Sequence, residues 1–128
     1  MYEIEVSLDF SAAHRLRKYK GKCENLHGHN WKVDVSLSSD KLSEIGIVAD
    51  FGDVKKLLKD VLEKLDHTNL NTVAYFTKAN PTSENIARYI YDELKKKRLK
   101  PSSVSVWESG DSKATYRESP SGRLRTRG

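Results

Sequence analysis

Two stretches of the sequence alternate between apolar and polar residues, and this period of two constrains the fold more than any other feature. Residues 2–10 place apolar side chains at the even positions, and residues 31–37 place them at the odd positions. Because successive side chains of a strand point to opposite faces of its sheet, each stretch predicts a strand with one buried face. The basic segment between them, which contains Gly21, is expected to form a loop.

The middle of the chain changes from this period to a helical one. Residues 45–51 are expected to form a short third strand. From Asp53 to Leu65 the apolar residues recur at spacings of three and four, which predicts an amphipathic helix with Asp50 as its N-cap. Residues 66–81 are then expected to form a loop.

The last part of the chain predicts a second helix and two strands. Thr82 or Ser83 is a candidate N-cap for the helix, which has a basic last turn and ends before Pro101. Residues 103–108 and 112–117 are expected to be strands joined by a tight turn. The predicted order of strands and helices favours an α+β fold, an antiparallel sheet with two helices on one face.

Two helices cannot cover both faces of such a sheet. A chain of 128 residues buries only about two thirds of its extended-chain surface when it folds alone, so oligomerisation is expected. The length suits one domain, which we assign to residues 1–117. Residues 118–128 are interpreted as a basic C-terminal tail, expected to be flexible.

Composition excludes several classes of protein. The one cysteine cannot form an internal disulfide or a Cys-rich zinc site, which favours a reducing cytoplasm over secretion. The sequence has no apolar run of about 18 residues and does not begin like a signal peptide, so no membrane partner is expected. The net charge of +5 invites a nucleic-acid hypothesis, but basic residues at a helix end and in a frayed tail explain much of it. We therefore expect no nucleic-acid partner.

Three of the four histidines continue the buried faces of the first two strands. His14 shares the parity of the even apolar residues, and His27 and His29 share the parity of the odd ones. Imidazole nitrogens are common zinc ligands, and three protein ligands that leave a fourth position open are typical of catalytic zinc. The alternative is that His27-Gly-His29 forms a turn, or that these are ordinary half-buried histidines.

Cys23 and the pair Asp66-His67 are candidates for proton transfer. Cys23 lies in a loop rich in Lys and Arg, which favour a thiolate. It could instead be a small buried side chain or a fourth, inhibitory zinc ligand. Asp66 and His67 suggest a carboxylate–imidazole relay, although such a pair also occurs at simple helix ends.

Two glutamates are candidates for ligand binding. Glu108 continues the apolar row of the strand at 103–108, where a carboxylate is costly unless a group with N–H donors pairs with it. The alternative is a position at the sheet edge that reaches water. Glu84 could be no more than a favourable acid in the first turn of the second helix.

Six short motifs, in order along the chain, resemble those of the 6-pyruvoyltetrahydropterin synthase family, and more closely its 6-carboxytetrahydropterin synthase branch. They are Phe10-Ser-Ala-Ala-His14, Cys23-Glu-Asn-Leu-His27-Gly-His29-Asn30, Val48-Ala-Asp-Phe-Gly52, Leu65-Asp-His67-Thr-Asn-Leu70, Pro81-Thr-Ser-Glu-Asn-Ile86 and Val106-Trp-Glu108. The resemblance implies the tunnelling fold, in which subunits join their sheets into a barrel. It also implies a homo-oligomer, usually a hexamer made of two trimers, with active sites at subunit interfaces.

The resemblance also implies roles for individual residues. His14, His27 and His29 would bind zinc, Cys23 would accept a proton, and Asp66 with His67 would form a relay that another subunit could complete. Glu108 would hold the pterin ring and join the relay. Three residues would line the same pocket: Thr82, Ser83 and Glu84.

The implied enzyme is a lyase that acts on 7,8-dihydroneopterin triphosphate. It would form 6-carboxy-5,6,7,8-tetrahydropterin and release acetaldehyde and triphosphate, on the route to queuosine. The five basic residues of the loop would suit the triphosphate: Arg15, Arg17, Lys18, Lys20 and Lys22.

Other functions remain open at this point. Glu24 gives the pattern Glu-x-x-His-Gly-His, which resembles a subgroup that cleaves the side chain to leave a 6-hydroxymethylpterin for folate synthesis, so the chain could be bifunctional. A 6-pyruvoyl product is a further alternative. A hypothesis of another class is an RNA-binding module with structural zinc, which predicts salt-dependent RNA affinity and no pterin turnover.

Overall fold

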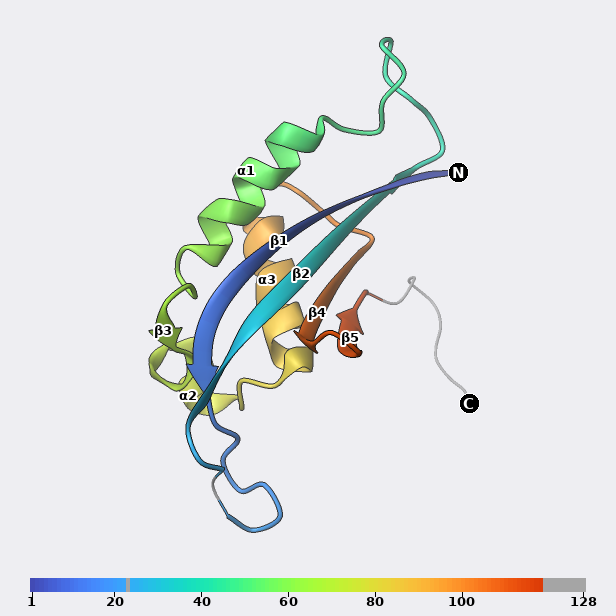
Figure 1. The fold of residues 1–128 in the computed structure, drawn as a ribbon. Coiled ribbons are helices and arrows are strands. Elements are labelled where there is room, and N and C mark those ends of the chain that lie inside the picture. Colours follow the sequence, from blue (N-terminus) through green and yellow to red (C-terminus); the bar gives the residue numbers. More distant parts are fainter. Residues whose placement is uncertain (23, 119–128) are drawn as a thin grey trace, which may run out of the picture.

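The computed structural model describes residues 1–22 and 24–118. The described chain forms strands, two long helices and two short helical segments (Figure 1). Their bounds are β1 Tyr2–His14, β2 His27–Ser39, α1 Phe51–Leu62, β3 Thr68–Asn69, the 3-10 helix η1 Leu70–Thr72, α2 Tyr75–Lys78, α3 Ser83–Lys96, β4 Ser103–Ser109 and β5 Ser112–Tyr116. The basic tail expected at 118–128 lies outside the described residues from 119 onward.

Strands β1 and β2 form a long antiparallel hairpin. Phe10 lies opposite Trp31, and His14 lies opposite His27 at the end where the basic loop joins the two strands. Both alternation patterns are confirmed, because the even side chains of β1 from Val6 onward and the odd ones of β2 from Trp31 to Leu37 are buried or partly buried beneath the helices, while Tyr2 at the start of β1 is exposed. The strands also continue through the histidines, so the register argument that paired them holds.

The sheet has the order β3-β1-β2-β4-β5. The four long strands pair antiparallel, and β3 adds a two-residue parallel pairing to the outer edge of β1. Helices α1 and α3 pack on one face of the curved sheet, α1 against β1 and α3 against β4 and β5 (Figure 1). The fold is therefore α+β, as predicted, with the hydrophobic core between the helices and this face.

The prediction of a third strand at 45–51 is wrong. Residues 44–49 form turns and bends, and Gly46 takes a φ of +87°, a conformation that no strand residue adopts. The Asp50 side chain accepts a hydrogen bond from the Asp53 N–H, and α1 begins at Phe51. Asp50 is thus the N-cap, as predicted. Phe51, which the prediction assigned to the strand, is instead the first residue of the helix.

The predicted loop at 66–81 contains more structure than expected. It holds β3, η1 and α2, whose short lengths fall below what periodicity detects. The other predictions for this half are confirmed. Thr82 caps α3, and β4 and β5 meet in a tight turn at Gly110.

The face of the sheet away from the helices is polar. Asp34 lies on it with only 6% of its surface exposed, accepting hydrogen bonds from Ser7 Oγ and Trp107 Nε1 at 2.5 and 2.7 Å. Lys32 and Lys113 place their ammonium groups over the Trp107 ring. Within residues 1–22 and 24–118, the helices are too short or too polar to cross a membrane.

Candidate metal centre and active site

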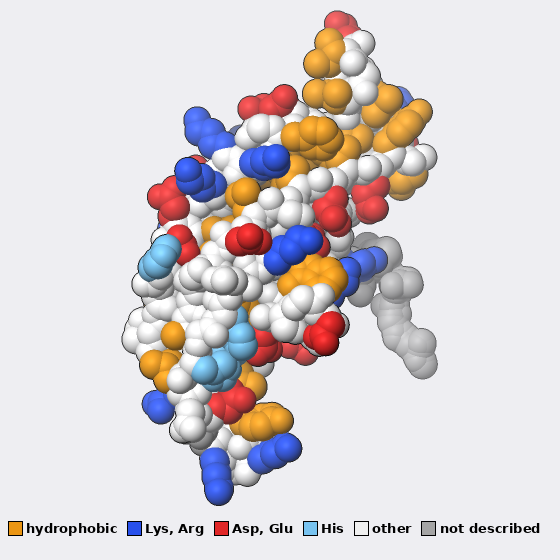
Figure 2. Space-filling model, viewed as in Figure 1, with side chains coloured by type: hydrophobic (Ala, Val, Ile, Leu, Met, Phe, Trp, Pro, Cys, Tyr) orange, Lys and Arg blue, Asp and Glu red, His pale blue; other side chains and the backbone are white. Residues whose placement is uncertain are grey.

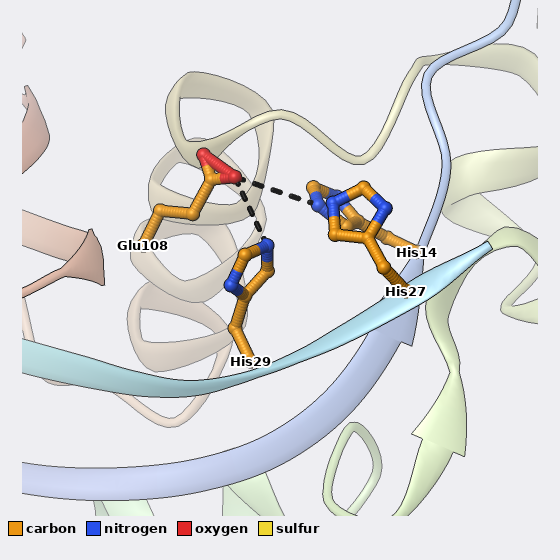
Figure 3. A group of neighbouring side chains, drawn as sticks. All are labelled: His14, His27, His29 and Glu108. Carbon is orange, nitrogen blue, oxygen red and sulfur yellow. Dashed lines mark ion pairs between the residues drawn. The ribbon is translucent and has the colours of Figure 1, made fainter. Parts of the chain in front are cut away.

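Three histidines and one glutamate converge at the loop end of the β1–β2 hairpin, near the end of β4. His14 ends β1, His27 and His29 begin β2, and Glu108 comes from β4 (Figure 3). Each offers one donor atom, and these atoms lie within 4.8 Å of one another. The structure thus brings together the three histidines that strand parity paired, and it adds Glu108 to them.

Trp31 holds the histidines from behind. Its ring is fully buried and contacts the rings of His14 and His29 edge to face, with centroids 4.8 and 5.1 Å away. Its Nε1–H donates to the Ala12 carbonyl across the hairpin at 3.1 Å. This packing fixes the imidazoles on the same face of the sheet as the hydrophobic core.

Backbone carbonyls set the orientation of two of the imidazoles. Nδ1 of His14 lies 2.7 Å from the Pro81 carbonyl oxygen, and Nδ1 of His27 lies 2.8 Å from that of Asn25. A carbonyl only accepts, so Nδ1 of each ring carries a proton, and in a neutral ring the lone pair is then on Nε2. This is the arrangement in which proteins present histidine to a metal.

Two of the inward nitrogens make no hydrogen bond in the described part of the chain. Nε2 of His14 and Nε2 of His29 are buried and accept or donate no hydrogen bond there. Burial, the largest effect, lowers the pKa of His29, which favours its neutral, ligating form. Unpartnered buried nitrogens are costly, so a cation bound between them explains the arrangement, and an imidazole-rich set suits zinc.

Glu108 stands at an irregularity of β4. The β4–β5 register shifts between Trp107 and Ser109, so Glu108 opposes no residue of β5. Its Oε1 lies 3.1 Å from Nε2 of His29 and 3.7 Å from Nε2 of His14. The Glu108 side chain is 40% exposed, so its carboxylate reaches solvent and also faces the imidazoles. Each of the two interpretations from sequence, a ligand-binding acid and a position that reaches water, was therefore incomplete.

Asp66 and His67 lie along the outer edge of β1, the edge that does not pair with β2. They directly precede β3, and the Ser11 N–H of β1 donates to Asp66 Oδ1 at 2.8 Å while the Ser11 carbonyl accepts from the His67 N–H. The hydrogen bond from Ser11 is the main cause that lowers the pKa of Asp66. His67 Nδ1 lies 3.0 Å from Asp66, but 82% of its side chain is exposed and it does not join the histidine cluster.

The start of α3 adjoins the cluster through its backbone. Thr82 uses its hydroxyl to accept the Asn85 N–H at 3.0 Å, and Ser83 and Glu84 begin the first turn, with Glu84 exposed. Pro81, the residue before the cap, supplies the carbonyl that holds His14. The predicted pocket residues are thus near the cluster in the fold, while Thr82 also has a structural task.

The basic loop is clamped to the body of the molecule. Arg17 donates from Nη2 to the carbonyls of Phe76 and Ala79, and its backbone N–H and C=O both bind the Asn80 side chain. Arg17 is therefore committed to structure. The other four predicted cations of the loop are exposed: Arg15, Lys18, Lys20 and Lys22.

Cys23 lies outside the described residues, so its predicted role stays a prediction. Its neighbour Glu24 closes the loop: the Glu24 N–H donates to the Leu16 carbonyl at 2.9 Å, and Glu24 Oε1 accepts the Leu16 N–H at 3.0 Å. The carboxylate of Glu24 thus already has a structural partner.

Sequence reasoning missed the carbonyl partners of the histidines and the buried Asp34. The carbonyls of Asn25 and Pro81 have no signal in a sequence, because every residue has one. Asp34 follows the polar parity of β2, and only its three-dimensional neighbours show that it is buried.

Comparison with known proteins gives consistent results. The family model described as 6-pyruvoyl tetrahydropterin synthase matches residues 3–119. The 6-carboxy-5,6,7,8-tetrahydropterin synthase of Haemophilus influenzae is 34% identical, covering 92% of this chain and all of its own length. A protein of Archaeoglobus fulgidus provisionally given the same name is 44% identical over 89% of this chain and 94% of its own.

Relatives with another name are also similar. The human 6-pyruvoyl tetrahydrobiopterin synthase is 37% identical over 73% of this chain and 74% of its own. Among solved structures, the 6-pyruvoyl tetrahydropterin synthase of Caenorhabditis elegans matches with a TM-score of 0.81 and 33% identity, covering 92% of this chain and 96% of that one. The fold and the family that the sequence motifs resemble are both confirmed.

Proposed function

Because this chain belongs to the 6-pyruvoyl tetrahydropterin synthase family, we propose that it is a zinc-dependent lyase that converts 7,8-dihydroneopterin triphosphate to 6-carboxy-5,6,7,8-tetrahydropterin. The reaction releases acetaldehyde and triphosphate. The observation that carries the proposal is the convergence of three imidazoles and a carboxylate, with the buried Nε2 atoms of His14 and His29 making no hydrogen bond in the described structure. The names of the two microbial relatives support the 6-carboxy product.

The metal would be held by His14, His27 and His29. Bound there, zinc supplies Lewis acidity toward the hydroxyl groups of the substrate side chain. The imidazoles are already held in place by Trp31 and by backbone carbonyls, so they need no large rearrangement to ligate it.

Proton transfer falls to Cys23 and His67 in this proposal. Cys23 accepts a proton from the substrate carbon, and its place four residues before His27 is what supports this role. Asp66 orients His67 through the 3.0 Å contact with Nδ1. Since His67 is exposed beyond the outer edge of β1, it serves the active site of a neighbouring subunit.

Glu108 binds the N–H groups of the pterin ring. A carboxylate accepts two parallel hydrogen bonds, and its partly exposed side chain leaves room for a ligand. Residues at the start of α3, which Pro81 ties to His14, line the same pocket: Thr82, Ser83 and Glu84.

The triphosphate binds to the exposed cations of the loop. Arg15, Lys18, Lys20 and Lys22 lie between the first histidine and Cys23 in the sequence, and Arg17 holds the loop in place. Cations clustered in one loop beside the site favour a small anionic substrate over RNA.

The active form is a homo-oligomer, which we propose to be a hexamer of two trimers whose sheets join into a barrel. The outer edge of β1 pairs with β3 only at its last residues, so most of this edge is free for another strand within the described chain. At the end of the molecule remote from the histidines, several apolar side chains are exposed (Figure 2): Tyr2, Leu42, Ile45 and Phe51. Both features suit contacts with further copies.

The proposed pathway is that of queuosine, and the proposed location is the cytoplasm. A thiol that acts as a base must stay reduced, and the cytoplasm keeps it so.

The product assay tests the proposal directly. The zinc-loaded protein is incubated with 7,8-dihydroneopterin triphosphate, and the products are identified by mass spectrometry, with chelator-treated protein as the control. We expect the 6-carboxy product from the zinc form alone. Its absence would overturn the reaction, and a 6-pyruvoyl or 6-hydroxymethyl product would replace it with one of the alternatives.

The role of Glu24 separates the two cleavage chemistries. Its carboxylate is engaged by the Leu16 N–H, which supports Cys23 as the base. We expect Cys23→Ala to abolish the 6-carboxy product while zinc stays bound. Activity retained in this variant would transfer the base to Glu24 or His67.

A further inference from the structure

The position of Glu108 matches a vertex of a metal polyhedron. In a tetrahedral zinc site with ligand distances of about 2.0–2.2 Å, neighbouring donor atoms are about 3.4 Å apart. Glu108 Oε1 lies 3.1 Å from Nε2 of His29 and 3.7 Å from Nε2 of His14, on either side of this value. The donor atom of His27 lies within 4.8 Å of the others. Relative to the nitrogens of His14 and His29, the oxygen therefore has the spacing expected of a further ligand (Figure 3).

The backbone of β4 is shaped to aim this side chain. The pairing of β4 with β2 ends at Trp107 opposite Lys32, and the pairing with β5 shifts register between Trp107 and Ser109. Glu108 thus lies outside both ladders, at an irregularity of the kind that redirects a side chain. Val104 and Val106, which precede it on the same row, are fully buried.

An ion pair with protonated imidazoles explains the contact less well. Nε2 of His14 and Nε2 of His29 make no hydrogen bond in the described structure, although Glu108 Oε1 lies only 3.1 Å from that of His29. A cation between the four donors satisfies every one of them.

The geometry points to a carboxylate exchange: Glu108 is the fourth ligand of the metal in the substrate-free enzyme, and it leaves the metal when it binds the pterin ring. The second half rests on the proposed function. Because 40% of the Glu108 side chain is exposed, it can turn without unpacking the core. Binding of the ring then opens the fourth position at the moment when the substrate side chain arrives. By linkage, binding of the ring weakens ligation of the metal by Glu108, and this ligation weakens the affinity for the ring by the same factor.

Zinc affinity without any pterin tests the first half. Metal-free wild type, Glu108→Gln and Glu108→Ala are titrated with zinc in competition with a chromophoric chelator. We expect both variants to bind zinc about tenfold more weakly or worse, the loss typical of a damaged metal site. Glu5→Gln, an exposed residue of β1, makes the same charge change and is expected to stay within about twofold. Circular dichroism of the metal-free proteins checks folding. Unchanged affinity in both Glu108 variants would overturn the inference.

A neutral probe separates ligation from the charge of Glu108. Imidazole is titrated into the cobalt(II)-loaded proteins, and the visible spectrum reports its binding to the metal. We expect Glu108→Ala to bind imidazole at least tenfold more tightly than wild type and than Glu5→Gln. Equal affinity in all three would mean that the fourth position is already open, and the inference would be wrong.

The exchange itself is tested with 7,8-dihydropterin, a ring without the side chain. Adding it to cobalt-loaded wild type should raise the affinity for imidazole, and it should have no such effect on Glu108→Ala. No effect on wild type would overturn the exchange, even if the ligation measurements hold. Failure of the proposed reaction is a separate result, because it appears in the product assay and leaves the zinc and imidazole titrations unchanged.

Discussion

Asp34 is the most deeply buried carboxylate on the open face of the sheet. It accepts hydrogen bonds from Ser7 and Trp107, and Lys32 lies 3.9 Å from it. Asp34→Ala would leave the partly buried Trp107 Nε1–H and the Ser7 hydroxyl without their acceptor, so we expect a loss of about 1–3 kcal/mol in the free energy of unfolding. Urea denaturation measures it. The exposed Asp40→Ala is the control, and equal stability of the two variants would contradict the assignment.

Asp66 predicts a dependence of stability on pH. The Ser11 N–H lowers its pKa in the folded chain below the ordinary 3.8, so folding favours the charged form. The stabilisation is complete above pH 3.8 and is lost as the pH falls through the lower, folded value. We expect the difference in urea midpoint between wild type and Asp66→Asn to shrink as the pH is lowered from 6 to about 2.5. A difference that stays constant over this range would contradict the account.

Single residues were predictable where a regular period placed them. The parity of His14, His27 and His29 follows from the strands and is confirmed by their convergence. Glu108 was recognised as an acid on an apolar row, but its approach to the histidines depends on the irregularity of β4, which no sequence pattern announces. The position of His67 beyond β1 depends likewise on tertiary structure.

At the scale of elements, α3 depends on its N-cap. The Thr82 hydroxyl accepts the Asn85 N–H, which would otherwise have no partner at the helix start. Thr82→Ala is expected to cost about 1 kcal/mol of unfolding free energy, and Thr82→Ser should restore most of it. Thermal denaturation of the metal-free proteins measures this. Ser83→Ala, one residue inside the helix, should have a smaller effect, and the reverse order would show that Ser83 is the cap.

Long elements were predicted and short ones were not. The hairpin, both long helices and the last two strands each span enough residues for a period to repeat. Residues 45–51 are too few for their pattern to distinguish a strand from an apolar turn. Gly46, with its positive φ, allows the turn that is observed. Within 66–81, the pieces β3, η1 and α2 are held by tertiary hydrogen bonds such as that of His67 with Ser11.

For the whole molecule, the proposed oligomer can be tested at the outer edge of β1, where a strand of another copy would pair. The N–H and C=O of Ser11 point to this edge, so those of Asp9, two residues earlier, point the same way. Asp9→Pro removes this outward donor without removing a bond to β2. We expect it to reduce the mass measured by light scattering from that of an oligomer toward that of a monomer.

Asp9→Ala is the matched control, since it keeps the N–H and should keep the oligomer. Circular dichroism shows whether both variants remain folded. An oligomer of unchanged mass in the proline variant would mean that the copies meet through other surfaces.

The β1–β2 hairpin has a consequence during synthesis of the protein on the ribosome. All three imidazole donors lie between residues 2 and 39, in strands that are neighbours both in sequence and in space. A nascent chain that has emerged only to the end of this hairpin therefore already carries them, while Glu108 is still to be translated. In the proposed metal centre, the three histidines are thus separated in time from Glu108 by the synthesis of about half of the chain, and Glu108 arrives with β4, the strand that pairs with the other side of β2.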